Sequence, residues 1–461
     1  MGMETYGMKR LLGLVLVVLL FGVMAPAQQS SPSSPAKPLP QLATTSPEFL
    51  RAADEVMAEM AKLLDLPAKA PLKKSLRSRD EIRAFLVQEM KGDKEPEKRY
   101  ADTKALEKFG LIPQGFPLDS FMLDLLTEQV AGLYDPKAKE FYIADWIPLE
   151  EQRVVMAHEL THALDDQYFN IDAWEKAARP NDDAELARDA VIEGSALAAM
   201  LDYAFREQKV SVRDLPDVTL LIRSQAISEM TKDPQLAKAP PFIRDELLFP
   251  YLGGTVFTQQ FLKASAGWGD FKKVFANPPA STQQILHPEL YLAGVRPQAV
   301  TLPDFSSLVP ADWKKLDENI IGEFGFHSVL KRFLGQERAE KLSPAWAGDR
   351  YAIFEDQKSK QTILVYRLAL HDEDDASRFF TAYSELLDLK YKTRTDNAHR
   401  PGFLSFQTPE GGVFLRCQGK QCLMVEGASR EIFEKINQAI EWPAASPDSF
   451  PQKTAAVVPA F

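Results

Sequence analysis

Apolar residues recur at every third or fourth position between residue 48 and about residue 118, which is the spacing of one face of an α-helix. The pattern is clearest in residues 52–66 (AADEVMAEMAKLLDL) and 77–90 (RSRDEIRAFLVQEM). No grouping of residues in this segment points to chemistry. We therefore predict a run of helices that serves as scaffold.

After Gln129 the spacing of apolar residues changes from one typical of a helix to one typical of extended strands. Residues 130–134 and 140–144 are typical of strands, and Asp135-Pro136-Lys137 between them favours a turn. These features predict a β-hairpin, which stands directly before the stretch AHELTHALDDQ at residues 157–167.

A second change begins near residue 342, where strand-like runs alternate with helical ones. We expect two strands, a helix, three strands and a last helix, at residues 349–356, 361–370, 372–391, 402–408, 411–418, 421–427 and 429–442. This ββαβββα order predicts an antiparallel sheet with two helices on one face. Residues 316–335, before it, are expected to form a helical hairpin. The fold class is thus α+β, with a helix-rich domain at residues 48–341 and an α+β domain at residues 342–443.

The amino terminus has the three parts of an export signal. Lys9 and Arg10 precede an apolar run at residues 11–24, and Ala25-Pro26-Ala27 offers a cleavage site. The run is shorter than the ~20 residues that span a bilayer. We predict a signal peptide at residues 1–27 and export to the periplasm or the extracellular space. An uncleaved membrane tether is the alternative.

Composition and net charge disfavour some classes of binding partner. The chain of 461 residues has a net charge of −11, which disfavours nucleic acid and anionic surfaces as partners. No stable membrane insertion is expected after signal cleavage. Residues 28–47 are rich in Ser and Pro and predict a disordered linker, and residues 444–461 predict a flexible tail. The oligomeric state does not follow from the sequence.

The chain has two cysteines, Cys417 and Cys422, in two strand-like runs on either side of the turn at residues 418–421. In an exported protein such a facing pair predicts a disulfide across a hairpin. A two-cysteine metal site is the alternative.

The stretch at residues 157–167 contains the pattern H-E-x-x-H. On a helix His158 and His162 share one face, so that two imidazole nitrogens can bind one ion. Glu159 lies about 100° further round the helix, where it suits contact with a metal-bound water. A helix with two structural histidines is the alternative, but a chance match is rare in a chain with six histidines. We predict one zinc ion.

Two histidines leave a catalytic zinc site incomplete, because such sites have three protein ligands. Glu193 lies among apolar residues in VIEGSA, and a carboxylate in that setting is costly unless it is paired or bound to metal. We predict Glu193 as the third ligand. Glu185 and Asp189, on the same helix face, are the alternatives, and the extension that would supply a third histidine is missing.

The motifs AHELTHALDDQ and VIEGSA resemble the gluzincin branch of zinc metallopeptidases, in which two histidines and a distant glutamate bind zinc. The chain is also similar to secreted bacterial neutral zinc metallopeptidases, which have stretches like EQVAGLYDP, FPYLGGTVF, STQQILHPELYL, IIGEFG and AGDRYAIF. The resemblance implies a zincin-like fold, a peptide or protein substrate that binds along an edge strand of the hairpin, and Glu159 as general base.

The resemblance also implies a side chain that stabilises the oxyanion. His287 and Tyr251 are the two positions that we consider. Asp165 and Asp189 could each orient a ligand imidazole through its other nitrogen.

These features together predict an exported zinc metallopeptidase in which Glu159 activates a water molecule. The alternative is a zinc-containing binding or assembly protein of the cell envelope, with the same fold and little turnover.

Overall fold

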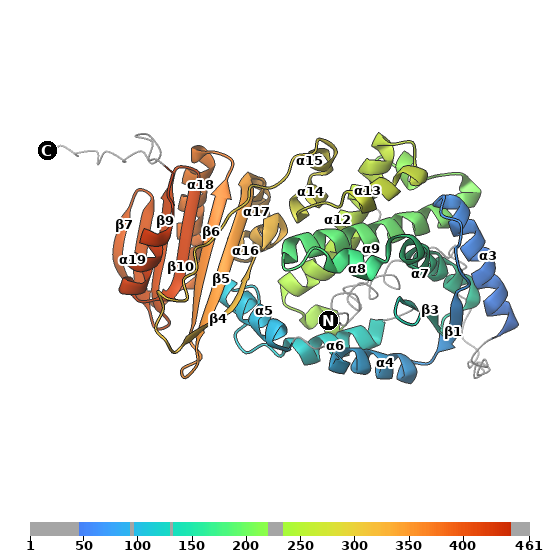
Figure 1. Ribbon diagram of the computed structural model, residues 1–461, viewed down its shortest axis with the longest axis horizontal. Helices are drawn as coiled ribbons and strands as arrows, with labels where there is room; N and C mark the ends of the chain where they lie inside the picture. Colours follow the sequence, from blue (N-terminus) through green and yellow to red (C-terminus); the bar gives the residue numbers. More distant parts are fainter. Residues whose placement is uncertain (1–45, 93–95, 130–131, 220–233, 444–461) are drawn as a thin grey trace, which may run out of the picture.

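The structure is a computed structural model that describes residues 46–92, 96–129, 132–219 and 234–443. The predicted signal peptide, most of the predicted linker and the predicted tail lie outside the described residues. A helical part and a seven-stranded sheet stand side by side (Figure 1). Across the described residues, no helix combines the length and the apolar character needed to span a bilayer.

The helical part is built around α7, α9 and α12. Its helices are α3 (Pro47–Leu63), α4 (Arg79–Gly92), α5 (Pro96–Phe109), α6 (Leu118–Gln129), α7 (Leu149–Phe169), α8 (Ile171–Lys176), α9 (Asp182–Ala204), α11 (Pro234–Lys238), α12 (Pro241–Ala264), α13 (Lys272–Ala276), α14 (Thr282–Leu286) and α15 (Pro288–Leu292). Almost every residue of α9 from Asp183 to Tyr203 is buried, so this helix runs through the core with neighbours on all sides.

A small sheet lies beside α7 and has the strand order β1-β3-β2. The predicted hairpin is present as β2 (Gly132–Asp135) and β3 (Glu140–Ala144), which pair antiparallel. The expectation of continuous helix between residues 48 and 118 was wrong at β1 (Lys73–Arg77), which pairs in parallel with β3. Local periodicity could not reveal this strand, because its partner lies more than 60 residues away.

Two glycines let α9 and α12 touch backbone to backbone. A Cβ atom on Gly194 would lie 2.0 Å from the carbonyl carbon of Gly254, and one on Gly254 would lie 1.9 Å from the backbone oxygen of Ala190. Neither distance is compatible with a side chain. The glycine after Glu193 therefore permits a close approach of two helices, and the partner is α12.

The large sheet has the order β4-β5-β6-β10-β9-β8-β7, and all of its neighbouring strands are antiparallel. Its strands are β4 (Trp313–Asn319), β5 (Trp346–Asp356), β6 (Thr362–Leu370), β7 (Thr395–Arg400), β8 (Phe403–Thr408), β9 (Gly411–Gln418) and β10 (Gln421–Ala428). The associated helices are α16 (Gly322–Leu334), α17 (Gln336–Leu342), α18 (Glu373–Lys390) and α19 (Arg430–Ala439). The predicted α+β class is confirmed.

Three details of the sheet prediction were wrong. Residues 316–335 are not a helical hairpin, because their first part belongs to β4. The order ββαβββα lacks β7, which pairs with β8 at the outer edge. The two helices also lie on opposite faces: α18 packs on the face that carries Tyr366 and Met424, and α19 packs on the face that carries Val365 and Val425. Both faces are covered because the central strands are apolar on both sides.

Cys417 and Cys422 are directly opposite each other in β9 and β10, and the structure joins them in a disulfide. The bond therefore crosslinks two strands that the turn between them already connects.

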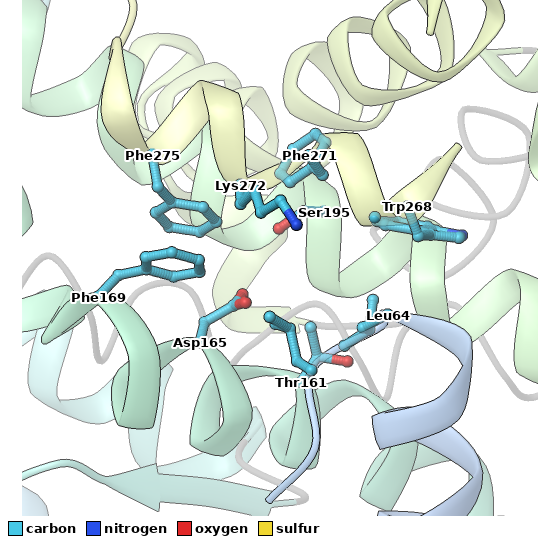
Figure 2. A pocket seen from close by; sticks show the side chains of 11 residues that line it. Leu64, Thr161, Asp165, Phe169, Ser195, Trp268, Phe271, Lys272 and Phe275 are labelled. Atoms are coloured by element: carbon cyan, nitrogen blue, oxygen red, sulfur yellow. The ribbon is translucent and has the colours of Figure 1, made fainter. Parts of the chain in front are cut away.

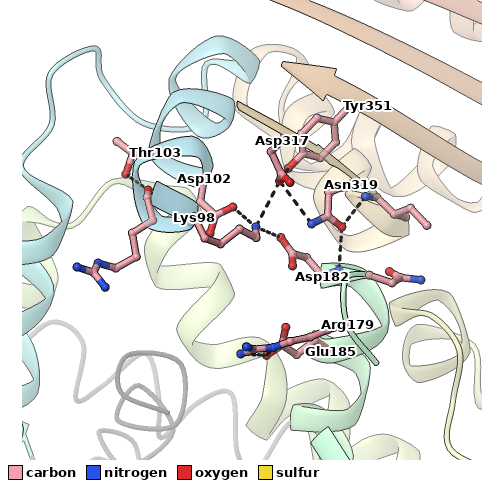
Figure 3. Close-up of polar contacts among 12 residues, drawn as sticks. Lys98, Asp102, Thr103, Arg179, Asp182, Glu185, Asp317, Asn319 and Tyr351 are labelled. Carbon is pink, nitrogen blue, oxygen red and sulfur yellow. Dashed lines mark hydrogen bonds and ion pairs between the residues drawn. The ribbon is translucent and has the colours of Figure 1, made fainter. Parts of the chain in front are cut away.

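The helical part and the sheet share a continuous apolar core. Phe109, at the end of α5, packs its ring edge to face against Tyr351 and Tyr366 of the sheet. A second connection is polar: Lys98 of α5 forms ion pairs with Asp182 at the start of α9 and with Asp317 of β4 (Figure 3). The boundary at residue 341 that the sequence suggested is thus crossed by the ring contacts of Phe109, from α5.

Several of the motifs downstream of Glu193 meet at the start of α9. Asp183 accepts hydrogen bonds from the backbone N–H and the hydroxyl of Thr282, in the STQQILH stretch. Its carboxylate lies against Gly322 of IIGEFG, whose N–H donates to Asp349 of AGDRYAIF. Burial raises the pKa of Asp183 to about 6. These motifs therefore anchor the helix that carries Glu193.

Candidate metal centre

Helix α7 positions three residues of the H-E-x-x-H motif. His158, Glu159 and His162 are all buried, and Met156, Leu160 and Leu164 of the same helix are fully buried. The imidazoles of His158 and His162 lie one helical turn apart, with ring centroids separated by 4.6 Å and ring planes almost perpendicular. This is the arrangement that the spacing predicts.

Helix α9 brings Glu193 to both imidazoles. Its Oε2 lies 3.2 Å from Nε2 of His158 and 3.5 Å from Nε2 of His162, and the two Nε2 atoms are 3.0 Å apart. Although burial opposes ionisation, the neighbouring His162 and His158 hold the pKa of Glu193 below its usual value. His158, His162 and Glu193 are a group whose ligand atoms could hold a metal ion; we call it the His–Glu cluster.

The alternative third ligands have other positions. Glu185 forms an ion pair with Arg179 at 3.0 Å. Asp189 is buried one turn before Glu193, but it does not belong to the group whose ligand atoms converge. Of the acidic residues considered on α9, the structure brings Glu193 to the histidines.

The hairpin holds Glu159 in place. The backbone N–H of Tyr134, in β2, donates a hydrogen bond of 2.9 Å to Oε2 of Glu159. The hydroxyl of the same tyrosine donates to Asp166 of α7, and Lys139 of the hairpin turn forms an ion pair with Asp166. Sequence reasoning missed Tyr134, Lys139 and Asp166. The only available signal was the hairpin directly before the motif, since the contact to Glu159 comes from the backbone.

Tyr251 of α12 lies against the His–Glu cluster. Its ring stacks on His158 at a centroid distance of 6.2 Å, and the side chain is fully buried. Burial raises the pKa of Tyr251 well above its usual value, and the nearby carboxylates of Glu193 and Asp189 add to the effect. Among the described residues its hydroxyl makes no hydrogen bond of normal geometry. The tyrosine is thus a neutral hydroxyl donor beside the cluster.

His287 is part of a different group. Its Nε2 is 2.8 Å from the buried carboxylate of Glu323, and this partner raises the pKa of His287. Glu323 in turn lies near Asp183, at the start of α9. Since Asp183 precedes Glu193 by ten residues, the two are about 15 Å apart along the helix. The structure therefore does not bring His287 to the His–Glu cluster.

The expected orientation of a ligand imidazole by Asp165 or Asp189 is not formed. Nδ1 of His158 and Nδ1 of His162 have no hydrogen-bond partner among the described residues. Asp165 instead lines a pocket beside Thr161, Ser195 and Lys272 (Figure 2). Helical spacing predicts that Asp165 lies on the same side of α7 as the two histidines. It could not show which other helices pack against that side.

A second acidic group contains Asp102, Asp182 and Asp317, whose oxygens lie close enough together to hold an ion. Lys98 lies among them and forms an ion pair with each (Figure 3). These attractions raise the pKa of Lys98 above its usual value, although burial opposes the shift. The chain thus supplies the cation of this group itself.

The comparisons with known proteins concern the sheet. A model described as a domain of unknown function (DUF8575) matches residues 310–437, which run from just before β4 into α19. No curated protein and no solved structure matches the chain. The match does not extend to α7, α9 or α12, which carry the His–Glu cluster and Tyr251.

Proposed function

We propose that the protein is an exported zinc metallopeptidase that hydrolyses peptide bonds. One observation carries the proposal: two imidazoles and a carboxylate converge in the core, and a second glutamate, Glu159, is held beside them by the edge strand β2. Among the described residues, the ion-pair partners of Glu193 are His158 and His162, and no lysine or arginine pairs with it. Buried groups of this kind favour a metal ion as the missing partner.

The distances fit zinc. Zinc bonds of about 2.0–2.1 Å to nitrogen and oxygen at tetrahedral angles separate the ligand atoms by ~3.3 Å. The three separations among Nε2 of His158, Nε2 of His162 and Oε2 of Glu193 are 3.0, 3.2 and 3.5 Å. Two imidazoles and one carboxylate are also the donor set of hydrolytic zinc sites that keep one position for water.

When zinc is bound, it lowers the pKa of water and polarises a carbonyl group. Glu159 then accepts a proton on its carboxylate from the attacking water and delivers it to the leaving amine. The hydrogen bond from the Tyr134 N–H fixes one oxygen of Glu159, so the carboxylate keeps one orientation during both transfers.

Strand β2 is the proposed binding strand for the substrate. Among the described strands its one neighbour is β3, so it is at an edge of its sheet. A Cβ atom on Gly132 would lie 3.3 Å from Cγ of Glu159, so this strand runs directly past the base. An extended peptide could pair with such an edge through main-chain hydrogen bonds and so present its carbonyl to Glu159.

Tyr251 is the proposed donor to the developing oxyanion. It is neutral and buried beside His158, and the stacking contact fixes its ring. Such a preorganised donor stabilises negative charge without reorganisation. His287 is not retained in this role, because its partner is Glu323.

Cleavage of casein and of a peptide library by the purified protein tests the proposal. We expect turnover with zinc, loss of turnover with a chelator, and recovery when zinc is added back. Glu159→Gln should lose at least about a thousandfold in kcat while its zinc content stays at that of the wild type. A matched control is Glu175→Gln, on α8. Bound zinc with no cleavage of any peptide would instead favour the binding-protein alternative.

A further inference from the structure

Asp165 is a buried carboxylate in the pocket between α7, α9 and α13. The residue is only 4% exposed, and among the described residues the influences on its carboxylate are burial and the charge of Asp166, with no hydrogen bond or ion pair. Burial, together with the charge of Asp166, raises its pKa well above the usual value. An isolated carboxylate in the interior is costly, so this position calls for a cationic partner.

We propose that this pocket binds a primary ammonium group of the substrate, so that the peptidase proposed above prefers lysine, or a free amino terminus, near the cleaved bond. The inference deepens the proposed function and rests on it for the identity of the substrate.

The lining suits an ammonium ion. The Asp165 carboxylate and the hydroxyl oxygens of Thr161 and Ser195 can accept its three N–H groups. Phe169 and Trp268 add aromatic rings to the wall, which favour a cation over an anion. Figure 2 shows the carboxylate pointing into the space between these side chains.

The pocket is built from the same two helices as the His–Glu cluster. Asp165 follows His162 by three residues and so lies on the same side of α7, whereas Ser195 lies two residues after Glu193 on α9, about 200° further round that helix. Three residues of helix correspond to about 4.5 Å. A side chain of a residue next to the cleaved bond could span this offset, since one extended residue covers ~3.3–3.6 Å.

The pocket also sets a limit on the size of the cation. The free space beside Asp165 is close to that of one water molecule. An ammonium group fits into such a space, whereas a planar guanidinium group does not. The site should therefore favour lysine over arginine.

Lys272 of α13 reaches the same pocket from its exposed position (Figure 2). No ion pair joins it to Asp165 among the contacts of the described residues. Since it has the same charge as the proposed ligand, it should weaken binding.

Titration of the full chain with n-butylammonium chloride, followed by calorimetry with and without zinc, tests the site without any turnover. We expect binding to the wild type, a loss of at least about tenfold in Asp165→Asn, and no change in the matched control Asp172→Asn. Lys272→Met should bind a few-fold more tightly. The absence of binding, or equal binding to Asp165→Asn, would overturn the site even if peptides are cleaved.

Peptides that carry lysine, norleucine or arginine beside the cleaved bond, with free or acetylated amino termini, form the second arm. We expect a kcat/KM for lysine at least about tenfold above that for norleucine, and loss of this preference in Asp165→Asn. Equal cleavage of lysine and norleucine peptides would overturn the substrate assignment. If no peptide is cleaved, the proposed function fails, and the calorimetric result still decides the amine site.

Discussion

Among the residues that the structure describes, two groups of acidic or histidine side chains have their ligand atoms within 4.8 Å of one another, and they differ in the source of positive charge. The Asp102, Asp182 and Asp317 group is partly exposed and surrounds Lys98. The His–Glu cluster is buried and has no lysine or arginine partner among the described residues. Proximity of ligand atoms is therefore weak evidence for a metal, and the lack of a resident cation in a buried group is stronger evidence.

Removal of one carboxylate from each group should give the largest difference between the groups, and the quantity that differs is the zinc affinity. We expect Glu193→Ala to lower zinc affinity by more than about a hundredfold, because it removes one of three protein ligands. Asp317→Asn should leave zinc affinity within about twofold of the wild type. Competition with a chromogenic chelator measures both. Equal losses in the two variants would contradict the distinction between the groups.

Tyr251→Phe should affect catalysis at the His–Glu cluster and leave the Asp102, Asp182 and Asp317 group unchanged. The hydroxyl has no hydrogen-bond partner of normal geometry among the described residues, so its loss should change unfolding by less than about 1 kcal/mol. Removal of an oxyanion donor should lower kcat by about tenfold to a hundredfold with KM and zinc content unchanged. Steady-state kinetics on one peptide separates these quantities. A kcat within twofold of the wild type would exclude this role.

Removal of Lys98 should turn the Asp102, Asp182 and Asp317 group into a site that binds a metal cation. We expect Lys98→Met to lose about 1–2 kcal/mol of unfolding free energy, since three carboxylates then repel one another at partly exposed positions. Millimolar calcium should raise the unfolding midpoint of this variant and leave the wild type unchanged. Thermal unfolding with and without calcium provides the measurement. A calcium response of equal size in the wild type would show that Lys98 does not fill the site.

Asp165 offers a third case, a buried acid without a cation, and its effect should be the smallest. The raised pKa means that the unfolded chain releases its proton first as the pH rises, so Asp165 lowers stability progressively from about pH 4 up to its folded pKa. Asn does not titrate. The unfolding free energy of Asp165→Asn relative to wild type should therefore increase between pH 5 and pH 8, by on the order of 1 kcal/mol. Urea denaturation of the zinc-free protein at both pH values measures the trend. A constant difference would argue against an uncompensated carboxyl.

The parts of the site that sequence could predict are those set by one helix or by composition. His158 and His162 share a face because four residues make about one turn. Glu193 was found from its apolar surroundings, since a carboxylate there needs a partner. The structure brings these three side chains together.

The parts that sequence missed depend on contacts between distant segments. The contact from Tyr134 to Glu159 uses a backbone N–H, which every residue except proline has, so no residue type marks it. His287 was one of the two positions considered for the oxyanion, but its partner is Glu323, 36 residues later. In the sheet, β4 was assigned to a helix because its apolar residues are few and its pairing partner β5 lies beyond α16 and α17.

The contact of Gly194 with Gly254 has a consequence for attempts to redesign the centre. Glu193 directly precedes Gly194, and Tyr251 lies one helical turn before Gly254. The positions of both side chains therefore depend on this one contact between α9 and α12. Any substitution that moves α9 and α12 apart at this contact displaces Glu193 and Tyr251 together. Engineering of this centre would therefore have to alter α9 and α12 as a unit, and single-site variation at either glycine should be tolerated poorly.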